Sequence, residues 1–332
     1  EEGEIEHTVT NKLSQDYPQD RLEIIVISDG STDRTDEIVQ NLTNRNRDRI
    51  KFLRQEPRQG KTQALNKAIA HATGDILVFS DANSIYAPDA IRRLVRGFAD
   101  PTVGYVTGRM IYTNPEGAGV GEGSSTYMGY ENLLRTLETR LGSIVGVDGG
   151  IDAIRQELYV PMRPDQLPDF VLPLNVVEQG KRVVYEPDAL SYEPVLTRAA
   201  DEFRMRVRVV LRALWALYDK RNLLNPLRFP LFAWQLLSHK VLRYAAFLPL
   251  IGFFIFNAGL IGLNRFYLWL FVLQLGAYSF AAVGHLLRGL PARAAKLLMP
   301  YYFVIVNVAC ALAFWKFLNR EKMVIWQPRG GV

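Results

Sequence analysis

Cysteine is almost absent from this chain of 332 residues: Cys310 is the only one, and it lies inside an apolar stretch. A single thiol excludes a framework of intrachain disulfide bonds and leaves the redox compartment open. The chain begins at Glu1 without an initiator methionine, a basic leader or an apolar leader, so we expect it to be a fragment that lacks its true start. With 48% hydrophobic residues, its length suffices for one large domain or two ordinary ones.

Acidic residues are scarce in the last third of the chain. From Leu227 onward the chain has 11 lysines and arginines but only one acidic residue, Glu321. The residues before Leu227 include 28 basic and 33 acidic ones. The net charge of +5 and the pI near 9.2 therefore come from the C-terminal part. Nucleic acid is excluded as a partner, because the N-terminal part that would have to bind it is net acidic.

Charge is missing altogether from three long apolar stretches, residues 244–264, 266–287 and 297–315. Each is close to the ~20 residues that a helix needs to cross a bilayer, so we predict three transmembrane helices. The alternative is a set of buried helices in a soluble bundle. Three crossings would put the C-terminal tail opposite the N-terminal domain, against the positive-inside tendency, unless one stretch is re-entrant at Pro249 or Pro300.

Residues 229–243, just before these stretches, combine an apolar face with His239, Lys240 and Arg243. This pattern predicts a helix that lies in the membrane interface, and its alternative is ordinary core packing. Residues 226–332 are thus expected to form an interfacial helix and about three transmembrane helices.

Residues 1–225 alternate short apolar runs with helical patterns and turns, which predicts an α/β domain with a mostly parallel sheet. We expect strands at residues 22–27, 50–52 and 75–79. Helices are expected at residues 33–44, 60–72 and 88–98.

Two of the expected strands end at an acid, the first at Asp29 and the third at Asp81. In an open α/β sheet, ligands bind beyond the carboxyl ends of the strands, so both acids are expected in one crevice. Asp29 would accept hydrogen bonds from a base or a ribose, and Gly30 would let the backbone approach closely. The alternative for this segment is a polar turn in which Ser31 or Thr32 caps the next helix.

Asp81 and Asn83 place two side-chain oxygen atoms two residues apart, as a site for Mg²⁺ or Mn²⁺ requires. The alternative is a capping acid after a strand. Gly60-Lys61-Thr62 is not a P-loop, because Gln55 stands where the first glycine is needed, but Lys61 is still expected to face phosphate.

The chain resembles the membrane-bound family 2 glycosyltransferases, the group that includes cellulose, chitin and hyaluronan synthases. The segments that carry the resemblance are LEIIVISDGSTDRTDEIV, RQGKTQALNKAI, GDILVFSDANSIYAPDAI, GSIVGVDGGIDAIR and LPDFVLPLNVVEQGKRVVYEPDA. The resemblance implies a GT-A catalytic domain over residues 1–225, whose first strand and preceding membrane segment would be missing before Glu1.

The resemblance also implies roles for single residues. The nucleotide-sugar site would comprise Asp29, Gly30, Lys61, Asp81 and Arg208. Asp81 and Asn83 would occupy the metal site, and Asp169 would be the catalytic general base, with Asp165 as its rival. The acceptor side would be lined by Gly149, Gly150 and Arg155.

Two departures from the family pattern matter. Pro168 stands where many members carry a second acid before the base. The QxxRW motif of processive synthases is missing; the corresponding region has Arg204 and Arg208, with Trp215 farther along. Either arginine would suit a phosphate, or the two would form a basic face near anionic headgroups. Processive polymerisation is therefore not predicted.

The resemblance implies an inverting, metal-dependent transferase that uses a nucleotide-diphosphate sugar and a saccharide or lipid-linked acceptor. It would lie in the inner (plasma) membrane with its catalytic domain in the cytoplasm, acting in exopolysaccharide or envelope glycan synthesis, with polysaccharide-export proteins as partners. One alternative is an enzyme that glycosylates a lipid carrier without extending a polymer. Another is a non-catalytic membrane scaffold that only binds nucleotide sugars. Asn83 favours this alternative, whereas the presence of Asp29, Asp81 and Asp169 argues against it.

Overall fold

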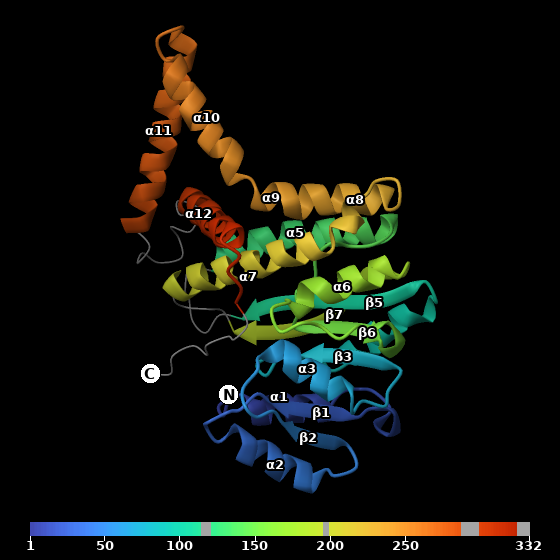
Figure 1. Ribbon diagram of the computed structural model, residues 1–332. Coiled ribbons are helices and arrows are strands. Elements are labelled where there is room, and N and C mark those ends of the chain that lie inside the picture. The colour runs from blue at the N-terminus through green and yellow to red at the C-terminus, as the bar shows by residue number, and fades with distance from the viewer. Residues whose placement is uncertain (114–120, 195–198, 287–298, 324–332) are drawn as a thin grey trace.

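The structure, a computed structural model, describes residues 1–113, 121–194, 199–286 and 299–323. Figure 1 shows an α/β domain formed by the N-terminal part of the chain, with apolar helices from the C-terminal part on one side of it. The expected ends of two apolar stretches, residues 287, 297 and 298, lie outside the described residues, as does Arg329 of the tail.

The chain begins with a small parallel unit in which β1 pairs with β2 and helices cover one face. Its elements are α1 (Ile5–Leu13), η1 (Gln19–Arg21), β1 (Ile24–Ser28), α2 (Thr35–Arg45), β2 (Ile50–Arg54) and α3 (Lys61–Ile69). Val9, Val39, Leu42 and Ile50 form its core. The four elements predicted for this part are therefore confirmed to within a few residues.

A second sheet has five strands in the order β3-β6-β5-β7-β4. Its strands and short helices are β3 (Ile76–Ser80), β4 (Ile85–Tyr86), α4 (Ala90–Arg96), η2 (Gly97–Ala99), β5 (Val103–Thr113), β6 (Ile151–Arg155), η3 (Gln156–Leu158) and β7 (Arg182–Pro194). Only β5 and β7 run parallel, and the other three neighbouring pairs are antiparallel. The α/β class is confirmed, but the mostly parallel sheet is wrong: β6 enters between β3 and β5 in the reverse direction.

Apolar side chains fill both faces of this sheet. The longer helices are α5 (Gly121–Leu141), α6 (Pro168–Glu178) and α7 (Ala199–Asp219), and η4 (Arg221–Leu224) follows. Ile154 of β6 packs in the core with α6 and α7, whereas its neighbour Ala153 packs in the core with α4. Successive side chains of a strand point to opposite faces, so each face of β6 receives its own helix layer.

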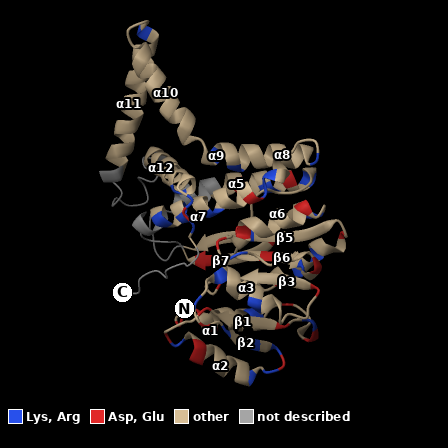
Figure 2. Cartoon of the chain, in the orientation of Figure 1, with Lys and Arg blue, Asp and Glu red and all other residues tan. Residues whose placement is uncertain are grey.

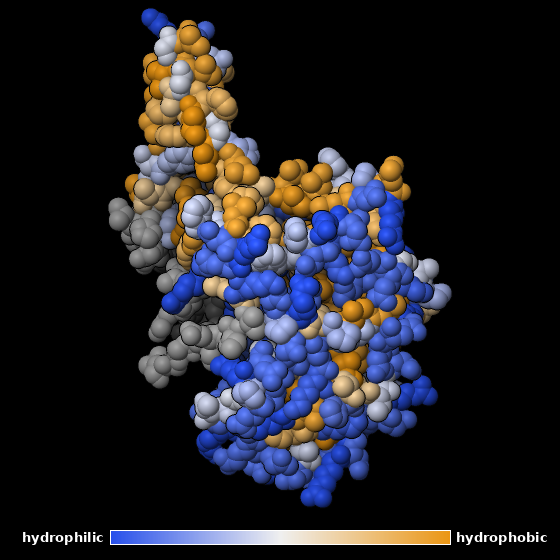
Figure 3. Space-filling model, viewed as in Figure 1, coloured by the Kyte–Doolittle hydropathy of each residue, from blue (hydrophilic) through white to orange (hydrophobic). Residues whose placement is uncertain are grey.

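The C-terminal helices are α8 (Pro230–Leu236), a π-helical turn (Leu237–Val241), α9 (Leu242–Tyr244), α10 (Phe247–Leu260), α11 (Arg265–Leu286) and α12 (Met299–Leu318). Two of them, over Arg265–Gly284 and Pro300–Leu318, are long and apolar enough to cross a membrane. They expose large apolar side chains such as Trp269 and Leu273, each 71% exposed. Figure 2 shows this region almost free of charge, and Figure 3 shows its apolar surface.

The first predicted transmembrane stretch, residues 244–264, is not one helix. The chain bends by 56° between Pro230–Tyr244 and Phe247–Leu260, and α10 has only 14 residues, about 21 Å at 1.5 Å per residue. That is shorter than the ~30 Å hydrocarbon core, so a crossing here would also need residues that flank α10. The break does not lie at Pro249, which occupies the first turn of α10, where proline is tolerated.

Residues 229–243 form the expected helical segment. It has features of both interpretations, core packing on one side and an exposed apolar surface on the other. Phe232 and Leu236 belong to the same hydrophobic core as residues of α6 and α7. Leu231 and Trp234 face outward, 42% and 63% exposed. Its position in a membrane interface stays a prediction.

The last helix returns to the α/β domain instead of leaving it. Ala309 and Ala313 of α12 are fully buried against Val207 and Leu211 of α7, because small side chains let two helices approach closely. Beyond α12, Lys322 Nζ lies 2.6 Å from Asp165 Oδ2, and Trp215 Nε1 donates a hydrogen bond to the Glu321 carbonyl. The described start of the tail, residues 319–323, therefore lies on the domain, whereas three crossings would put it on the opposite side of a membrane.

This contact predicts an even number of membrane crossings between residues 244 and 319. With Cys310 replaced by alanine, single cysteines at Asn44 of α2 and Asn319 of the tail should react with a membrane-impermeant maleimide from the same side of sealed vesicles. A cysteine at Leu263, between α10 and α11, should react from the other side. Labelling of Asn319 from the Leu263 side would contradict the arrangement.

Candidate active site

Asp29, at the end of β1, ties this strand to the loop that leads into α3. Its carboxylate accepts hydrogen bonds from the backbone N–H groups of Gln59 (2.9 Å) and Gly60 (2.8 Å) and from Gln55 Nε2 (2.6 Å). Arg58 Nε lies 3.6 Å away. Gln55 thus has a structural role in holding Asp29. Together these contacts fix the Asp29 carboxylate next to the start of α3, where Lys61 is the first residue.

The turn after Asp29 needs a glycine, since Gly30 has a φ of +66° and a Cβ there would lie 3.4 Å from the Cβ of Arg58. The alternative that Ser31 or Thr32 caps α2 is wrong. The N-cap position is Arg34, whose side chain makes no capping hydrogen bond, and the Asp33 carboxylate just before it accepts a hydrogen bond from the Thr35 backbone N–H at 3.1 Å.

Lys61 joins three parts of the chain at one point. It is the first residue of α3, directly after Gly60, whose φ is +91°. Its Nζ lies 2.5 Å from Asp81 Oδ1 and 3.9 Å from Asp169 Oδ1. The structure thus brings together Lys61, Asp81 and Asp169, and Asn83 lies half-buried in the turn between β3 and β4.

Asp169 stands in the first turn of α6, after Pro168 at the helix start. Gly149 makes room for it: a Cβ on Gly149 would lie 2.4 Å from Asp169 Cγ, and the φ of Gly149 is +88°. Gly150 is equally tight, since a Cβ there would lie 2.5 Å from Glu193 Oε1. Gly149 therefore lies against Asp169, and Gly150 against Glu193.

The surroundings of Asp169 suit a general base. Burial raises the pKa of its carboxyl, and the Asp81 carboxylate raises it further, while the Lys61 ammonium opposes both. The side chain remains 32% exposed, so a hydroxyl group can reach it. A carboxylate with a raised pKa takes up a proton more readily than an ordinary aspartate does.

Asp165, the rival base, is occupied elsewhere. Its side chain is 8% exposed and forms ion pairs with Arg163 (3.3 Å) and Lys322 (2.6 Å). Burial acts to raise the pKa of Asp165, but hydrogen bonds from Lys322 and Arg163 outweigh it and lower the pKa. Such a carboxylate is a weak proton acceptor.

The structure does not bring Arg155 to this site. Arg155 lies at the end of β6 that pairs with Ile76, whereas Ile151 at the other end pairs with Ser80 beside Asp81. Its guanidinium donates hydrogen bonds to the carbonyls of Val103, Phe98 and Asp100. Arg155 therefore fastens β6 to η2 and β5.

Sequence reasoning missed Arg212, although arginines recur every four residues of α7 at Arg204, Arg208 and Arg212. The buried guanidinium of Arg212 donates hydrogen bonds to the Thr62 hydroxyl (3.1 Å) and to three successive backbone carbonyls before α6. These carbonyls belong to Pro164 (3.3 Å), Asp165 (3.1 Å) and Gln166. It thus fixes the loop that presents Asp169. Arg208 lies half-buried one turn earlier on α7.

Sequence reasoning also missed Asp152, an acid within the otherwise apolar start of β6. It is 1% exposed, between Phe79 of β3 and Thr107 of β5. Neither carboxylate oxygen has a hydrogen-bond partner of good geometry among the residues described, and burial raises the pKa of Asp152 to about 8. At neutral pH the group is therefore mostly protonated, which avoids a further charge under Lys61 and Asp169.

No set of three histidine, cysteine or acidic side chains that could hold a metal occurs in the described ranges. The residues nevertheless fit a cation that also binds a diphosphate. Asp81 is 37% exposed and already attracts an ammonium group, and Asn83 can add one oxygen. The remaining ligands would have to come from the bound substrate.

Comparisons with known proteins agree with this geometry. A family model, Glycosyl transferase family 2, matches residues 1–159. Residues 1–159 are thus similar to that family. A solved mannosyltransferase from Pyrobaculum calidifontis, in complex with GDP-Man and Mn²⁺, superposes with a TM-score of 0.72 at 25% identity and covers 97% of this chain and 85% of its own. The domain has the GT-A fold, as predicted.

Two curated relatives are enzymes that make glycans or glycolipids. Poly-beta-1,6-N-acetyl-D-glucosamine synthase from Staphylococcus aureus is 28% identical over 244 residues, which is 70% of this chain and 57% of that protein. Beta-monoglucosyldiacylglycerol synthase from Synechocystis is 37% identical over 116 residues, which is 34% of this chain and 24% of that protein. The chain thus spans little more than half the length of the first relative.

The contact between Gly149 and Asp169 predicts a selective defect for Gly149→Ala. The added Cβ would displace Asp169, so transfer should fall at least about 100-fold, as when a general base is lost. Gly180→Ala is a matched control, since Gly180 has a φ of +77° but open space around it. Both variants strain a backbone with a positive φ, but only Gly149→Ala adds a clash; equal activities in the two would contradict the contact's role.

Proposed function

We propose that this chain is an inverting glycosyltransferase that moves a sugar from a nucleotide-diphosphate sugar to a saccharide or lipid-linked acceptor. The observation that carries the proposal is the convergence of Asp29, Lys61, Asp81 and Asp169 from four separate segments on one edge of the sheets. The family 2 match, the mannosyltransferase bound to GDP-Man and the two relatives support it.

Asp169 is the proposed general base. Its carboxylate takes the proton of the acceptor hydroxyl as the acceptor oxygen bonds to the anomeric carbon of the donor. The bond between that carbon and the diphosphate oxygen breaks at the same time, and the nucleoside diphosphate leaves. Attack opposite the leaving group inverts the anomeric configuration. Arg212 holds the preceding loop, so the base keeps its place as its charge changes.

The donor would lie between Asp29 and Asp81. Asp29 and Gly30 form the nucleotide side, while Lys61 and, from α7, Arg208 offer positive charge to the diphosphate. Asp81 and Asn83 would hold Mg²⁺ or Mn²⁺, which when bound supplies positive charge to the departing diphosphate. When the donor binds, Lys61 can exchange its contact with Asp81 for a phosphate oxygen, since it is 43% exposed.

The membrane is the proposed place of action. The apolar helices α10 to α12 and the outward side of α8 would hold the catalytic domain against the cytoplasmic face of the inner membrane, where nucleotide sugars are available. Exopolysaccharide or envelope glycan synthesis is the proposed pathway, with polysaccharide-export proteins as partners. This assignment rests on the likeness to the staphylococcal synthase.

Asp169→Asn tests the catalytic role. An amide cannot take the acceptor's proton, so transfer should fall by about 10²- to 10⁴-fold while nucleotide binding stays near the parent value. Nucleotide release from a panel of nucleotide sugars, measured with the protein in liposomes, identifies the donor and gives the rate of transfer. Asp165→Asn is the matched control. Turnover that survives in Asp169→Asn but not in Asp165→Asn would make Asp165 the general base instead of Asp169.

Divalent cations test the other half of the mechanism. Excess chelator should abolish transfer, and Mg²⁺ or Mn²⁺ should restore it. Asn83→Asp should keep or raise the affinity for the metal, because hard cations prefer carboxylate oxygen. Full activity in chelator would remove the metal from the proposal, and metal-dependent nucleotide binding without any transfer would favour the non-catalytic scaffold.

A further inference from the structure

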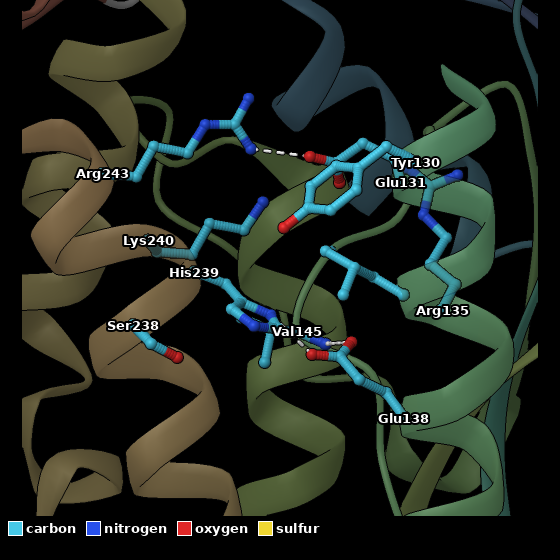
Figure 4. A pocket seen from close by; sticks show the side chains of 11 residues that line it. Tyr130, Glu131, Arg135, Glu138, Val145, Ser238, His239, Lys240 and Arg243 are labelled. Atoms are coloured by element: carbon cyan, nitrogen blue, oxygen red, sulfur yellow. Dashed lines mark hydrogen bonds and ion pairs between the residues drawn. The ribbon is translucent and has the colours of Figure 1, made fainter. Parts of the chain in front are cut away.

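A cavity of about 240 Å³ lies apart from Asp29 and Asp81, between α5 and the π-helical turn Leu237–Val241. Figure 4 shows the side chains of Tyr130, Glu131, Arg135 and Glu138 coming from α5, and those of His239, Lys240 and Arg243 facing them. Ligand sites for drug-sized molecules usually measure ~300–1,000 Å³, so this cavity suits a smaller group, of the size of one sugar ring.

Acids and bases alternate around the cavity. Arg243 Nη1 lies 2.7 Å from Glu131 Oε1, and His239 Nδ1 lies 2.7 Å from Glu138 Oε1. Arg135 forms a two-pronged ion pair with Asp148, at 2.5 and 2.6 Å. Three permanent cations, Arg135, Lys240 and Arg243, thus line the same small space as two acids, Glu131 and Glu138, and Arg135 and Arg243 are each paired with an acid.

Two hydrogen-bond donors on the cavity wall have no hydrogen-bond acceptor among the described residues. The Nε–H of Arg135, a residue 6% exposed, lacks a hydrogen-bond acceptor among the described residues. Lys240 forms no ion pair or hydrogen bond within that part of the chain, and its Nζ lies 5.5 Å from the centre of the Phe170 ring. A buried donor without an acceptor, such as Arg135 Nε–H, is costly, and a ligand with oxygen atoms would satisfy both it and the half-buried Lys240 ammonium.

The π-helical turn is a second sign of a site. Ser238, His239 and Lys240 are consecutive, yet all three line the cavity, which the wider turn of a π-helix allows. Single π-helical turns inside α-helices are frequent at functional sites.

The cavity is joined to the catalytic base along two short routes. Lys240 lies over Phe170, the neighbour of Asp169. Arg135 holds Asp148, and the next residue, Gly149, is in contact with Asp169. A group bound in the cavity would therefore lie on the acceptor side of Asp169.

The lining chemistry favours a neutral saccharide over a phosphate. A phosphate would bring about two negative charges to a space where Arg135 and Arg243 are already paired with Asp148 and Glu131. Sugar hydroxyls can both accept from Lys240 and Arg135 and donate to the carboxylates. The ring of Tyr130, which is 58% exposed at the cavity, offers an apolar surface to the face of a sugar.

We infer that the cavity between α5 and the π-helical turn is a binding site for one sugar unit of a saccharide acceptor. The inference rests on the proposed function only in that the bound sugar belongs to the acceptor. It selects the saccharide among the acceptors left open above.

Direct binding tests the inference without transfer. Full-length protein in detergent is mixed with methyl glycosides of glucose, galactose, mannose and N-acetylglucosamine, and saturation-transfer difference NMR measures the affinity of each. Saturating nucleoside diphosphate is present to occupy the donor site. At least one glycoside should bind. Tyr130→Ala and Lys240→Met should each weaken that binding by about tenfold and leave nucleotide affinity unchanged.

Tyr218→Ala is the matched control, since Tyr218 is 53% exposed on α7 and does not line the cavity. Binding of none of the four glycosides, or equal weakening by the control, would overturn the inference. Inorganic phosphate that binds in the parent and not in Lys240→Met, without glycoside binding, would make the cavity an anion site instead. An inactive chain that still binds a glycoside here would contradict the proposed function and leave the sugar site standing.

Discussion

The arrangement of the active site depends on one ammonium group held among carboxylates. Burial alone would lower the pKa of Lys61, but the charges of Asp169 and Asp81 outweigh it and raise that pKa. Lys61 in turn keeps both acids close together at the sheet edge, where two bare carboxylates would repel each other. Asp152 beneath them avoids the same repulsion by keeping its proton. The site can therefore accept further positive charge, which a divalent metal ion bound with the donor would supply.

The loop before Asp169 is held from two directions. Arg212 of α7 binds the carbonyls of this loop from within, and Lys322 of the tail binds the Asp165 carboxylate from outside. Because α12 packs along α7 and leads directly to Lys322, the apolar helices and the base share one rigid connection. A shift of α12 relative to α7 would thus reach Asp169 through a few side chains.

Much of this was predictable from sequence, and the failures have physical causes. Asp29, Lys61, Asp81 and Asp169 follow strand ends or begin helices, where local pattern and family motifs coincide. The reversed direction of β6 leaves no local trace, because strand direction is fixed by pairing partners far away in the chain. Arg155 was misplaced for that reason: it shares a short motif with Gly149 and Gly150, yet an antiparallel strand carries it to the opposite end of the sheet. Asp152 and Arg212 depend on burial, which single positions do not reveal.

The charge division along the chain acquires a structural meaning from the α8–α9 segment. Its basic side chains do not only face outward, as a helix on an anionic surface would require. Arg243 and His239 turn inward to Glu131 and Glu138 of α5. Phe232 and Leu236 pack into the catalytic core, while Trp234 stays outside. The segment therefore binds the acidic domain on one side and offers apolar surface on the other. Since the same contacts form the wall of the cavity between α5 and the π-helical turn, the docking of the domain on the apolar helices and the shape of that cavity depend on the same residues.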